Sequence, residues 1–372
     1  MNMFSSIIFA DSYDHPATEL IEKRTLASIP FGGRFRLIDF VLSSLTNAGV
    51  TNIAVMPKKN YASLEDHLGG GKYWDLDHRN SGLKILSPFF KTANNNEVFL
   101  ARGKLDALRS VQPHIRSLKE EYIVLTNGNL VANIDFEKVF KAHIESGADV
   151  TAVYANTDTY APRALELSLE GTKVKGITYV SADDSGKRNI SLNVYVMKRD
   201  LLLDIIREAD AHDHYSFEKY ALINKVDTLN IAGFEHTEFA KIVYSVQDYY
   251  NTSMQMLDSD VRSAIFTEKR PVMTRVKDSV PVLYQYNAKI SNSLIADGCK
   301  IDGTVKNSII FRNVTIETGA VVENCIIMQN TVVGKESSLS NVILDKNIKI
   351  SDKKELCGDA QYPFILKKGS EI

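Results

Sequence analysis

The sequence predicts an α/β protein in which a doubly wound domain with a mostly parallel sheet precedes a parallel β-helix. Up to about residue 260, short apolar runs typical of buried strands alternate with segments of helical periodicity. Beyond about residue 283, helical patterns disappear and four similar blocks rich in isoleucine and valine follow one another. We therefore predict a first domain over 1–260, a linker over 261–282 and a β-helix over 283–372.

The first domain opens with the pattern strand, long loop, helix, strand. Residues 7–10 form a short apolar run, and residues 52–56 form a second one. Between them, residues 37–48 carry apolar side chains at helical spacing, and Gly49 supplies a C-terminal stop. Ligands of such domains bind at the carboxyl ends of the strands. The loop after residue 10 is therefore the first place to look for a site.

The same alternation continues to the end of the first domain. Buried strands are expected at 122–125, 149–154 and 194–197, and amphipathic helices at 136–143 and 201–209. This order of elements favours a largely parallel sheet with crossover helices.

The four C-terminal blocks each begin with an asparagine and recur every 15 to 17 residues. The asparagines are Asn292, Asn307, Asn324 and Asn341. Nine residues after each of them comes an aliphatic residue: Ile301, Ile316, Val333 and Ile350. So short a repeat predicts stacked coils built from hexapeptides, each adding one aliphatic residue to a buried column.

Composition excludes several classes of function. The formal net charge is -2, with 44 basic and 46 acidic residues, so a nucleic-acid partner is not expected. No apolar run approaches the roughly 20 residues that a membrane span requires, and the first residues do not resemble a signal peptide. The three cysteines all lie in the C-terminal part. We expect a cytoplasmic, reduced protein with no membrane partner.

Residues 30–40, Pro-Phe-Gly-Gly-Arg-Phe-Arg-Leu-Ile-Asp-Phe, carry a resemblance to a known family. They closely resemble the start of bacterial ADP-glucose pyrophosphorylase, also called glucose-1-phosphate adenylyltransferase. Residues 73–77, 102–107 and 249–254 resemble further segments of that family. The resemblance covers the whole chain. It implies a Rossmann-like, GT-A-like nucleotidyltransferase domain followed by a left-handed β-helix.

The chemistry of that family is missing from this sequence. The glycine-rich loop that should hold the triphosphate corresponds to residues 10–18, which contain no glycine and no arginine but two aspartates. The family's nearby lysine corresponds to Leu26. The two aspartates that should bind Mg²⁺ correspond to Gly128 and Ile242. We expect no catalytic residue, no metal site and no cofactor on this chain alone; Mg²⁺ is expected on a catalytic partner.

Two further family motifs are altered. The Glu-Lys-Pro segment of the sugar-phosphate site is absent from 179–184, and Asp-Phe-Gly-Lys-Asp appears as Ser-Phe-Glu-Lys-Tyr at 216–220. Gly32 and Gly33 are expected to form a tight turn. The resemblance places basic groups of this region near phosphate and effector sites, so Arg34 and Arg36 are candidates for binding an anionic effector.

The resemblance therefore implies a non-catalytic, GlgD-type regulatory subunit. Its partner would be a catalytic adenylyltransferase subunit in a hetero-oligomer, by analogy a tetramer, and a small phosphorylated molecule would be its effector. The chain alone is expected to be inactive or nearly so. One alternative is an active sugar-phosphate nucleotidyltransferase with an altered phosphate loop. Another is an acyltransferase, but such enzymes need a histidine on the β-helix and the last histidine is His236.

Overall fold

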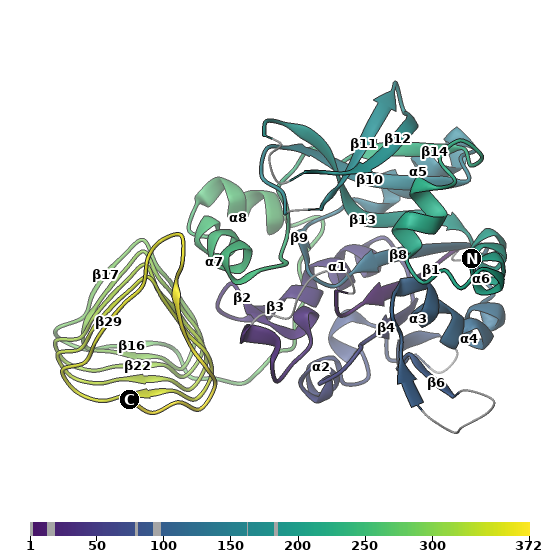
Figure 1. Ribbon diagram of the computed structural model, residues 1–372. Coiled ribbons are helices and arrows are strands. Elements are labelled where there is room, and N and C mark those ends of the chain that lie inside the picture. The colour runs from purple at the N-terminus through teal and green to yellow at the C-terminus, as the bar shows by residue number, and fades with distance from the viewer. Residues whose placement is uncertain (1–2, 13–18, 79–80, 92–97, 162, 182–184) are drawn as a thin grey trace.

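The computed structural model consists of an α/β domain with a β-helix beside it (Figure 1). It describes residues 3–12, 19–78, 81–91, 98–161, 163–181 and 185–372. The predicted fold class is confirmed. None of the helices in these ranges is long and apolar enough to cross a membrane.

The α/β domain is built on a nine-stranded sheet of order β10-β14-β12-β11-β13-β8-β1-β4-β5. Its strands are β1 (Phe4–Phe9), β4 (Asn52–Met56), β5 (Gly82–Ile85), β8 (Tyr122–Asn127), β10 (Val150–Thr157), β11 (Leu165–Glu170), β12 (Lys173–Tyr179), β13 (Arg188–Lys198) and β14 (Ile231–Glu235).

This sheet is mixed, whereas the sequence suggested a mostly parallel one. Strands β8, β1, β4 and β5 are parallel, as are β10 and β14, but β13 runs antiparallel to β8, β10 and β11. Strand β11 is also antiparallel to β12, and for this pair the reason is local. Only two residues connect β11 to β12, and Gly171 adopts a left-handed conformation there with φ of 61°. So short a connection can join only antiparallel strands.

Helices cover both faces of the sheet. They are α1 (Leu37–Asn47), α2 (Ala62–Leu68), α3 (Lys104–Ser110), α4 (Gln112–Ser117), α5 (Phe136–Ser146), α6 (Arg199–Ala211), α7 (Val246–Gln255), α8 (Ser259–Ile265) and a short π-helix (Glu218–Ile223). Side chains of β1 alternate between two cores, because successive strand residues face opposite sides. Ile7 and Phe9 pack with α3, α4 and α6, whereas Phe4 and Ile8 pack with α1, α2 and α5.

The remaining elements of the domain are short. They are the strands β2 (Pro30–Phe31), β3 (Phe35–Arg36), β6 (Phe89–Lys91), β7 (Val98–Leu100), β9 (Leu130–Ala132) and β15 (Ala240–Ile242), and the 3-10 turns Glu19–Ile21, Leu26–Ser28 and Lys72–Trp74. Strands β2 and β3 form a hairpin whose turn is Gly32 and Gly33, both with positive φ. The hairpin then leads into α1.

The β-helix consists of three parallel five-stranded sheets. Their strands are β16 (Leu283–Tyr284), β19 (Lys300–Ile301), β22 (Thr315–Ile316), β25 (Val332–Val333) and β28 (Lys349–Ile350); β17 (Lys289–Ser291), β20 (Thr304–Lys306), β23 (Val321–Glu323), β26 (Ser338–Ser340) and β29 (Glu355–Cys357); and β18 (Leu294–Ile295), β21 (Ile309–Ile310), β24 (Ile326–Ile327), β27 (Val342–Leu344) and β30 (Phe364–Leu366).

The repeat positions predicted from the sequence lie directly above one another. Ile301 pairs in register with Ile316, which pairs with Val333, which pairs with Ile350, and all four are buried. The asparagines that begin the blocks adopt left-handed backbone conformations, with φ between 41° and 53°. Asparagine tolerates this conformation better than other side chains. Each block therefore begins at a corner of the coil.

A shared hydrophobic core joins the two domains. Tyr249 and Tyr250 of α7 pack with Phe31, Phe40 and residues of the β-helix such as Ile326. The Tyr249 hydroxyl donates to the carbonyl of Pro30 at 2.8 Å, and the Tyr250 hydroxyl donates to the carbonyl of Asn324 at 2.7 Å. Helix α8 extends past residue 261, where we expected the linker to begin, so the irregular segment starts at Phe266.

Candidate functional site

The loop after β1 presents a carboxylate toward backbone amides at the carboxyl end of the sheet. Asp11 Oδ1 accepts a hydrogen bond from the N–H of Leu26 at 3.1 Å, and Oδ2 accepts one from the N–H of Lys58 at 2.7 Å. Burial raises the pKa of Asp11, while these amides act in the opposite direction. The backbone N–H groups of Leu26 and Lys58 are therefore already bonded to the Asp11 carboxylate. Residues 13–18 of the expected phosphate loop lie outside the described residues.

Leu26 lies in the apolar core between the two domains. It is buried and packs in the same cluster as Phe31 and Tyr249. A lysine at this position would bring an ammonium into apolar surroundings, which is costly without a partner. The position is therefore part of the packing between domains in this chain.

Gly128 has no room for a side chain. Its N–H donates to the carbonyl of Phe9 at 2.8 Å, and a Cβ atom at residue 128 would lie 2.8 Å from the Cβ of Ala27. That separation is shorter than carbon atoms tolerate, so either Ala27 or the backbone would have to move. A carboxylate at residue 128 is thus sterically excluded in this conformation.

Ile242 lies on the strand next to Gly128. It pairs with Leu130 across β15 and β9, and Asn129 is bonded to Val243 through its side-chain amide at 2.7 Å and its carbonyl at 3.0 Å. The fold thus brings together the two segments that carry the family's metal ligands, but residues 128 and 242 themselves offer no side-chain oxygen. Within the described ranges, no group of three or more His, Cys, Asp or Glu residues is arranged to hold a metal ion.

A buried ion pair occupies the space beside these positions. The ammonium of Lys104, at the start of α3, contacts the carboxylate of Glu218 in the π-helix, and both side chains are almost fully buried. The ammonium also lies 5.3 Å from the ring centre of Phe9. The family segments that these residues match carry threonine and glycine instead. Our sequence analysis quoted both segments but missed the pair.

Little open volume remains around this ion pair. The cavity that it borders, together with Asn127, Ser191 and Asn193, has a volume of about 30 Å³. The described side chains around the ion pair therefore leave little open space.

The two candidate arginines differ in their surroundings. Arg34 is exposed and its guanidinium lies 5.6 Å from the ring centre of Phe35. Arg36 is half-buried and donates to the carbonyl and the hydroxyl of Ser63 at 2.6 and 2.9 Å. Burial lowers the pKa of Arg36 to about 10. Arg36 is therefore the more strongly desolvated of the two cations.

Further cations act on Arg36 from distant parts of the chain. We call Arg24, Arg36, Arg275, Lys277 and Lys346 the basic seam, because they come from both domains and the linker. Burial and the neighbouring Arg36 and Arg24 lower the pKa of Lys346 to about 7, although Asp345 acts in the opposite direction.

The acidic groups in this region are already engaged, and Asp39 accepts hydrogen bonds from the backbone N–H of Arg36 at 2.9 Å and the hydroxyl of Thr274 at 2.6 Å. Arg24 forms a two-pronged ion pair with Asp345, with distances of 2.8 and 2.6 Å, and Arg275 pairs with Asp66 at 2.9 Å. No described residue forms a hydrogen bond or ion pair with the ammonium of Lys346. The basic seam thus carries excess positive charge, as a site for a multivalent anion requires. Sequence reasoning found Arg36 alone, because the other members are far apart along the chain.

Comparisons with known proteins match both domains of the chain. The family model "Nucleotidyl transferase" matches residues 16–165, and the model "GlmU-like, C-terminal hexapeptide" matches residues 281–362. The glycogen biosynthesis protein GlgD of Bacillus subtilis is 34% identical over 368 residues, covering 99% of this chain and 96% of that protein. GlgD of Geobacillus stearothermophilus is 38% identical over 373 residues, covering 99% and 97%. The chain belongs to the GlgD family.

Similarity of this GlgD-family chain to the adenylyltransferases themselves is lower. The glucose-1-phosphate adenylyltransferase of Clostridioides difficile is 26% identical over 302 residues, covering 79% of this chain and 77% of that protein. Both kinds of relative share the nucleotidyltransferase scaffold with the chain. The resemblance predicted from residues 30–40 is therefore confirmed at the level of the family.

Proposed function

We propose that this chain is a regulatory, catalytically degenerate subunit of a glucose-1-phosphate adenylyltransferase in glycogen biosynthesis. A catalytic subunit would form ADP-glucose and diphosphate from ATP and glucose 1-phosphate and would hold the Mg²⁺. The observation that carries the proposal is the buried Lys104–Glu218 ion pair, whose Glu218 belongs to an altered family motif, together with a Gly128 that has no room for a carboxylate. In this proposal the nucleotidyltransferase fold is retained, while the Lys104–Glu218 ion pair occupies space that a catalytic subunit would leave to its ligands.

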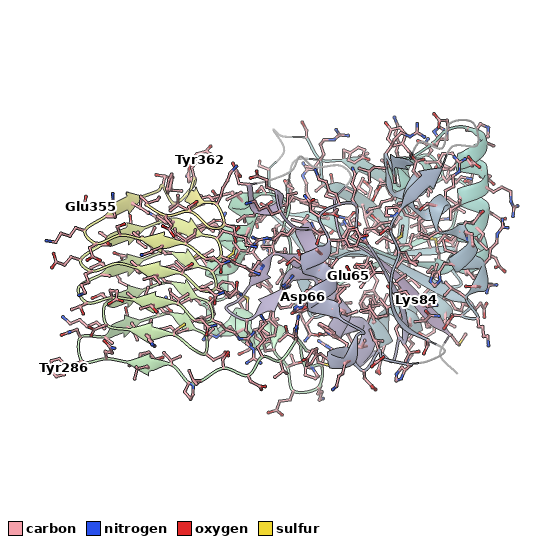
Figure 2. The ribbon with its side chains drawn as sticks, turned by 90° about the horizontal axis from the view of Figure 1, so that it is seen from below. Glu65, Asp66, Lys84, Tyr286, Glu355 and Tyr362 are labelled. Carbon is pink, nitrogen blue, oxygen red and sulfur yellow. The ribbon has the colours of Figure 1, made fainter. Side chains whose placement is uncertain are left out.

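The first coil of the β-helix supports a partner chain. Its strands β16, β17 and β18 each have an unpaired edge, and Leu283, Tyr284 and Tyr286 are exposed there. Figure 2 shows Tyr286 projecting from this end, away from Glu355 and Tyr362 at the other end. Proteins protect sheet edges with charged residues such as lysine, and the edge strands β16, β17 and β18 carry only one, Lys289. We infer that the β-helix of the catalytic subunit covers this coil.

The last coil carries more charge than the first, as expected if only the first coil is covered by a partner. It carries lysine and acidic side chains on and beside its edge strands, namely Lys349, Asp352, Lys353, Lys354 and Glu355. Charge of this kind opposes continuation of the stack. The contrast between the two ends favours the first coil as the interface of the hetero-oligomer, a tetramer by analogy with the family.

The basic seam supports a small phosphorylated effector. Arg36 and Lys346 are desolvated cations from different domains, so an anion between them would contact both domains at once. Such a ligand regulates the partner only if it binds two states of the assembly with different affinity. A seam between domains can supply that difference, because its geometry changes whenever the domains shift. The complex would reside in the cytoplasm.

The test is an assay of ADP-glucose formation from ATP, glucose 1-phosphate and Mg²⁺. This chain alone is expected to show no turnover. Added to a catalytic subunit, it is expected to change the Michaelis constants or the response to phosphorylated effectors. Co-purification that leaves every kinetic constant of the catalytic subunit unchanged would contradict the regulatory role. Turnover by this chain alone would instead favour an active enzyme with an altered phosphate loop.

A further inference from the structure

A second, much larger cavity lies between β13, in the middle of the nine-stranded sheet, and α7. Its volume is about 570 Å³, and its walls come from the segment after β10, from β13, from β15 and from α7. Small-molecule sites usually have volumes of about 300–1,000 Å³. Helix α7 contributes Asp248, Asn251, Thr252 and Gln255, whose spacing of three or four residues places them on one helix face.

This cavity includes Ile242, the position of one family metal ligand, and it shares Ala164 and Tyr244 with the small space beside the Lys104 ion pair. Ile190 and Leu192 of β13 line the cavity, whereas Ser191 and Asn193 line the small space beside the Lys104 ion pair. Successive residues of a strand point to opposite sides. The two spaces therefore meet β13 from opposite sides, and neither Lys104 nor Glu218 lines the larger one.

The wall of the cavity is mainly apolar and carries one ammonium. Its apolar side chains are Tyr160, Ile190, Leu192, Ile242 and Met254. Lys241 lies among them, and burial lowers the pKa of its ammonium. No residue in the described part of the chain forms a hydrogen bond or ion pair with that ammonium. A half-buried cation without a partner is costly, so an acceptor in the cavity would be stabilising.

The two carboxylates that act on Lys241 are already engaged elsewhere. Asp248 Oδ2 accepts hydrogen bonds from the backbone N–H groups of Tyr244 at 3.2 Å and Ser245 at 3.0 Å. Asp158 Oδ1 accepts a hydrogen bond from the hydroxyl of Thr159 at 3.1 Å. Both favour the charged form of Lys241 from a distance, but neither forms an ion pair with it. The ammonium thus remains available to a ligand.

We propose that this cavity binds a small organic anion with an apolar body. The anionic group would contact the Lys241 ammonium, and the body would pack between β13 and α7. Aromatic and branched carboxylates or sulfonates have this chemistry. The proposal is independent of the regulatory role proposed above, because the cavity includes neither the first coil nor the basic seam.

Two fluorescent probes with the same apolar body test the proposal on the full chain. Anilinonaphthalene sulfonate is an anion, and phenylnaphthylamine is its neutral counterpart. We expect one sulfonate site per chain. Lys241→Met should weaken sulfonate binding roughly tenfold and leave the neutral probe unchanged, because only the charge-assisted contact is lost. Lys119→Met, at an exposed lysine outside the cavity, is the matched control and should change neither affinity.

A filling variant tests the location of the site separately. Met254→Trp adds a ring to the α7 wall and should abolish binding of both probes, with circular dichroism reporting that the chain is folded. Wild-type affinities in both Lys241→Met and Met254→Trp would show that the probes bind elsewhere and would overturn the proposal. Equal weakening of both probes by Lys241→Met would overturn the preference for an anion, even if Met254→Trp fails to fold. None of these outcomes tests whether the chain changes the activity of a catalytic subunit, so the two proposals fail independently.

Discussion

Lys104 and Glu218 form an ion pair whose side chains are only 5% and 6% exposed. Each charge depends on the other, because a single buried charge keeps its desolvation cost without a compensating attraction. Glu218 also belongs to residues 216–220, one of the family motifs that are altered in this chain.

Removing one partner of this pair should be strongly destabilising. Glu218→Gln leaves the Lys104 ammonium buried without a counter-charge, and we expect a loss of about 3–5 kcal/mol in the free energy of unfolding. The double variant Lys104→Met with Glu218→Leu should recover most of that loss, because it removes both charges. Urea denaturation followed by circular dichroism measures both. A double variant that is no more stable than Glu218→Gln would contradict the buried pair.

Any side chain at residue 128, including the aspartate of the family motif, should lower the stability of the fold. Gly128→Ala already introduces a Cβ atom against Ala27, and we expect it to cost about 1–3 kcal/mol. Gly176→Ala is the matched control, because its Cβ would meet only Ser168 at an ordinary 3.6 Å. Thermal unfolding compares the two variants. Equal melting temperatures would show that the contact with Ala27 relaxes at no cost.

Anion binding at the basic seam should weaken as pH rises through neutrality. The pKa of Lys346 is lowered to about 7, so its ammonium loses its proton just above that pH and no longer attracts an anion. An anion favours the charged form and raises this pKa, so binding near pH 7–8 should be accompanied by proton uptake. Isothermal titration with diphosphate in buffers of different ionisation enthalpy measures that uptake. In Lys346→Met the proton uptake should disappear; its persistence would assign it to another group.

The same residue should make stability depend on pH in the alkaline range. Lys346 binds its proton less tightly in the folded state than in the unfolded state, whose pKa is near the ordinary 10.5. The unfolded state therefore binds more protons between about pH 7 and 10.5, and stability should rise with pH across that window. Comparing the urea midpoints of wild type and Lys346→Met isolates this contribution from other groups. Identical slopes in the two proteins would contradict it.

A charge on the first coil should prevent assembly without unfolding the chain. Tyr286 is fully exposed, so Tyr286→Glu costs the monomer little but would place a carboxylate in an apolar interface. Tyr362→Glu at the other end of the β-helix is the matched control, because Tyr362 is 80% exposed. Analytical ultracentrifugation with a catalytic subunit should show the mixed oligomer for Tyr362→Glu only. Assembly of both variants would exclude the first coil as the interface.

The sequence by itself determined the fold class and the family, and it showed that several motifs of the adenylyltransferases are altered. Repeats such as Ile301, Ile316, Val333 and Ile350 are visible because each coil packs on its neighbour at a fixed spacing, so a local pattern fixes the arrangement. The substitutions at Gly128 and Leu26 were visible because they fall inside motifs. Strand direction was less well predicted, since it depends on connections such as the two-residue turn after β11.

Only the tertiary structure decided which side chains meet beside the altered family motifs. Lys104 and Glu218 are 114 positions apart, and Arg24 and Asp345 are 321 positions apart. Contacts at such separations leave no periodicity in the sequence, because the whole topology must form before the side chains meet. The Lys104–Glu218 ion pair, the basic seam and the cavity at Lys241 therefore all form only when distant segments of the chain come together in the fold.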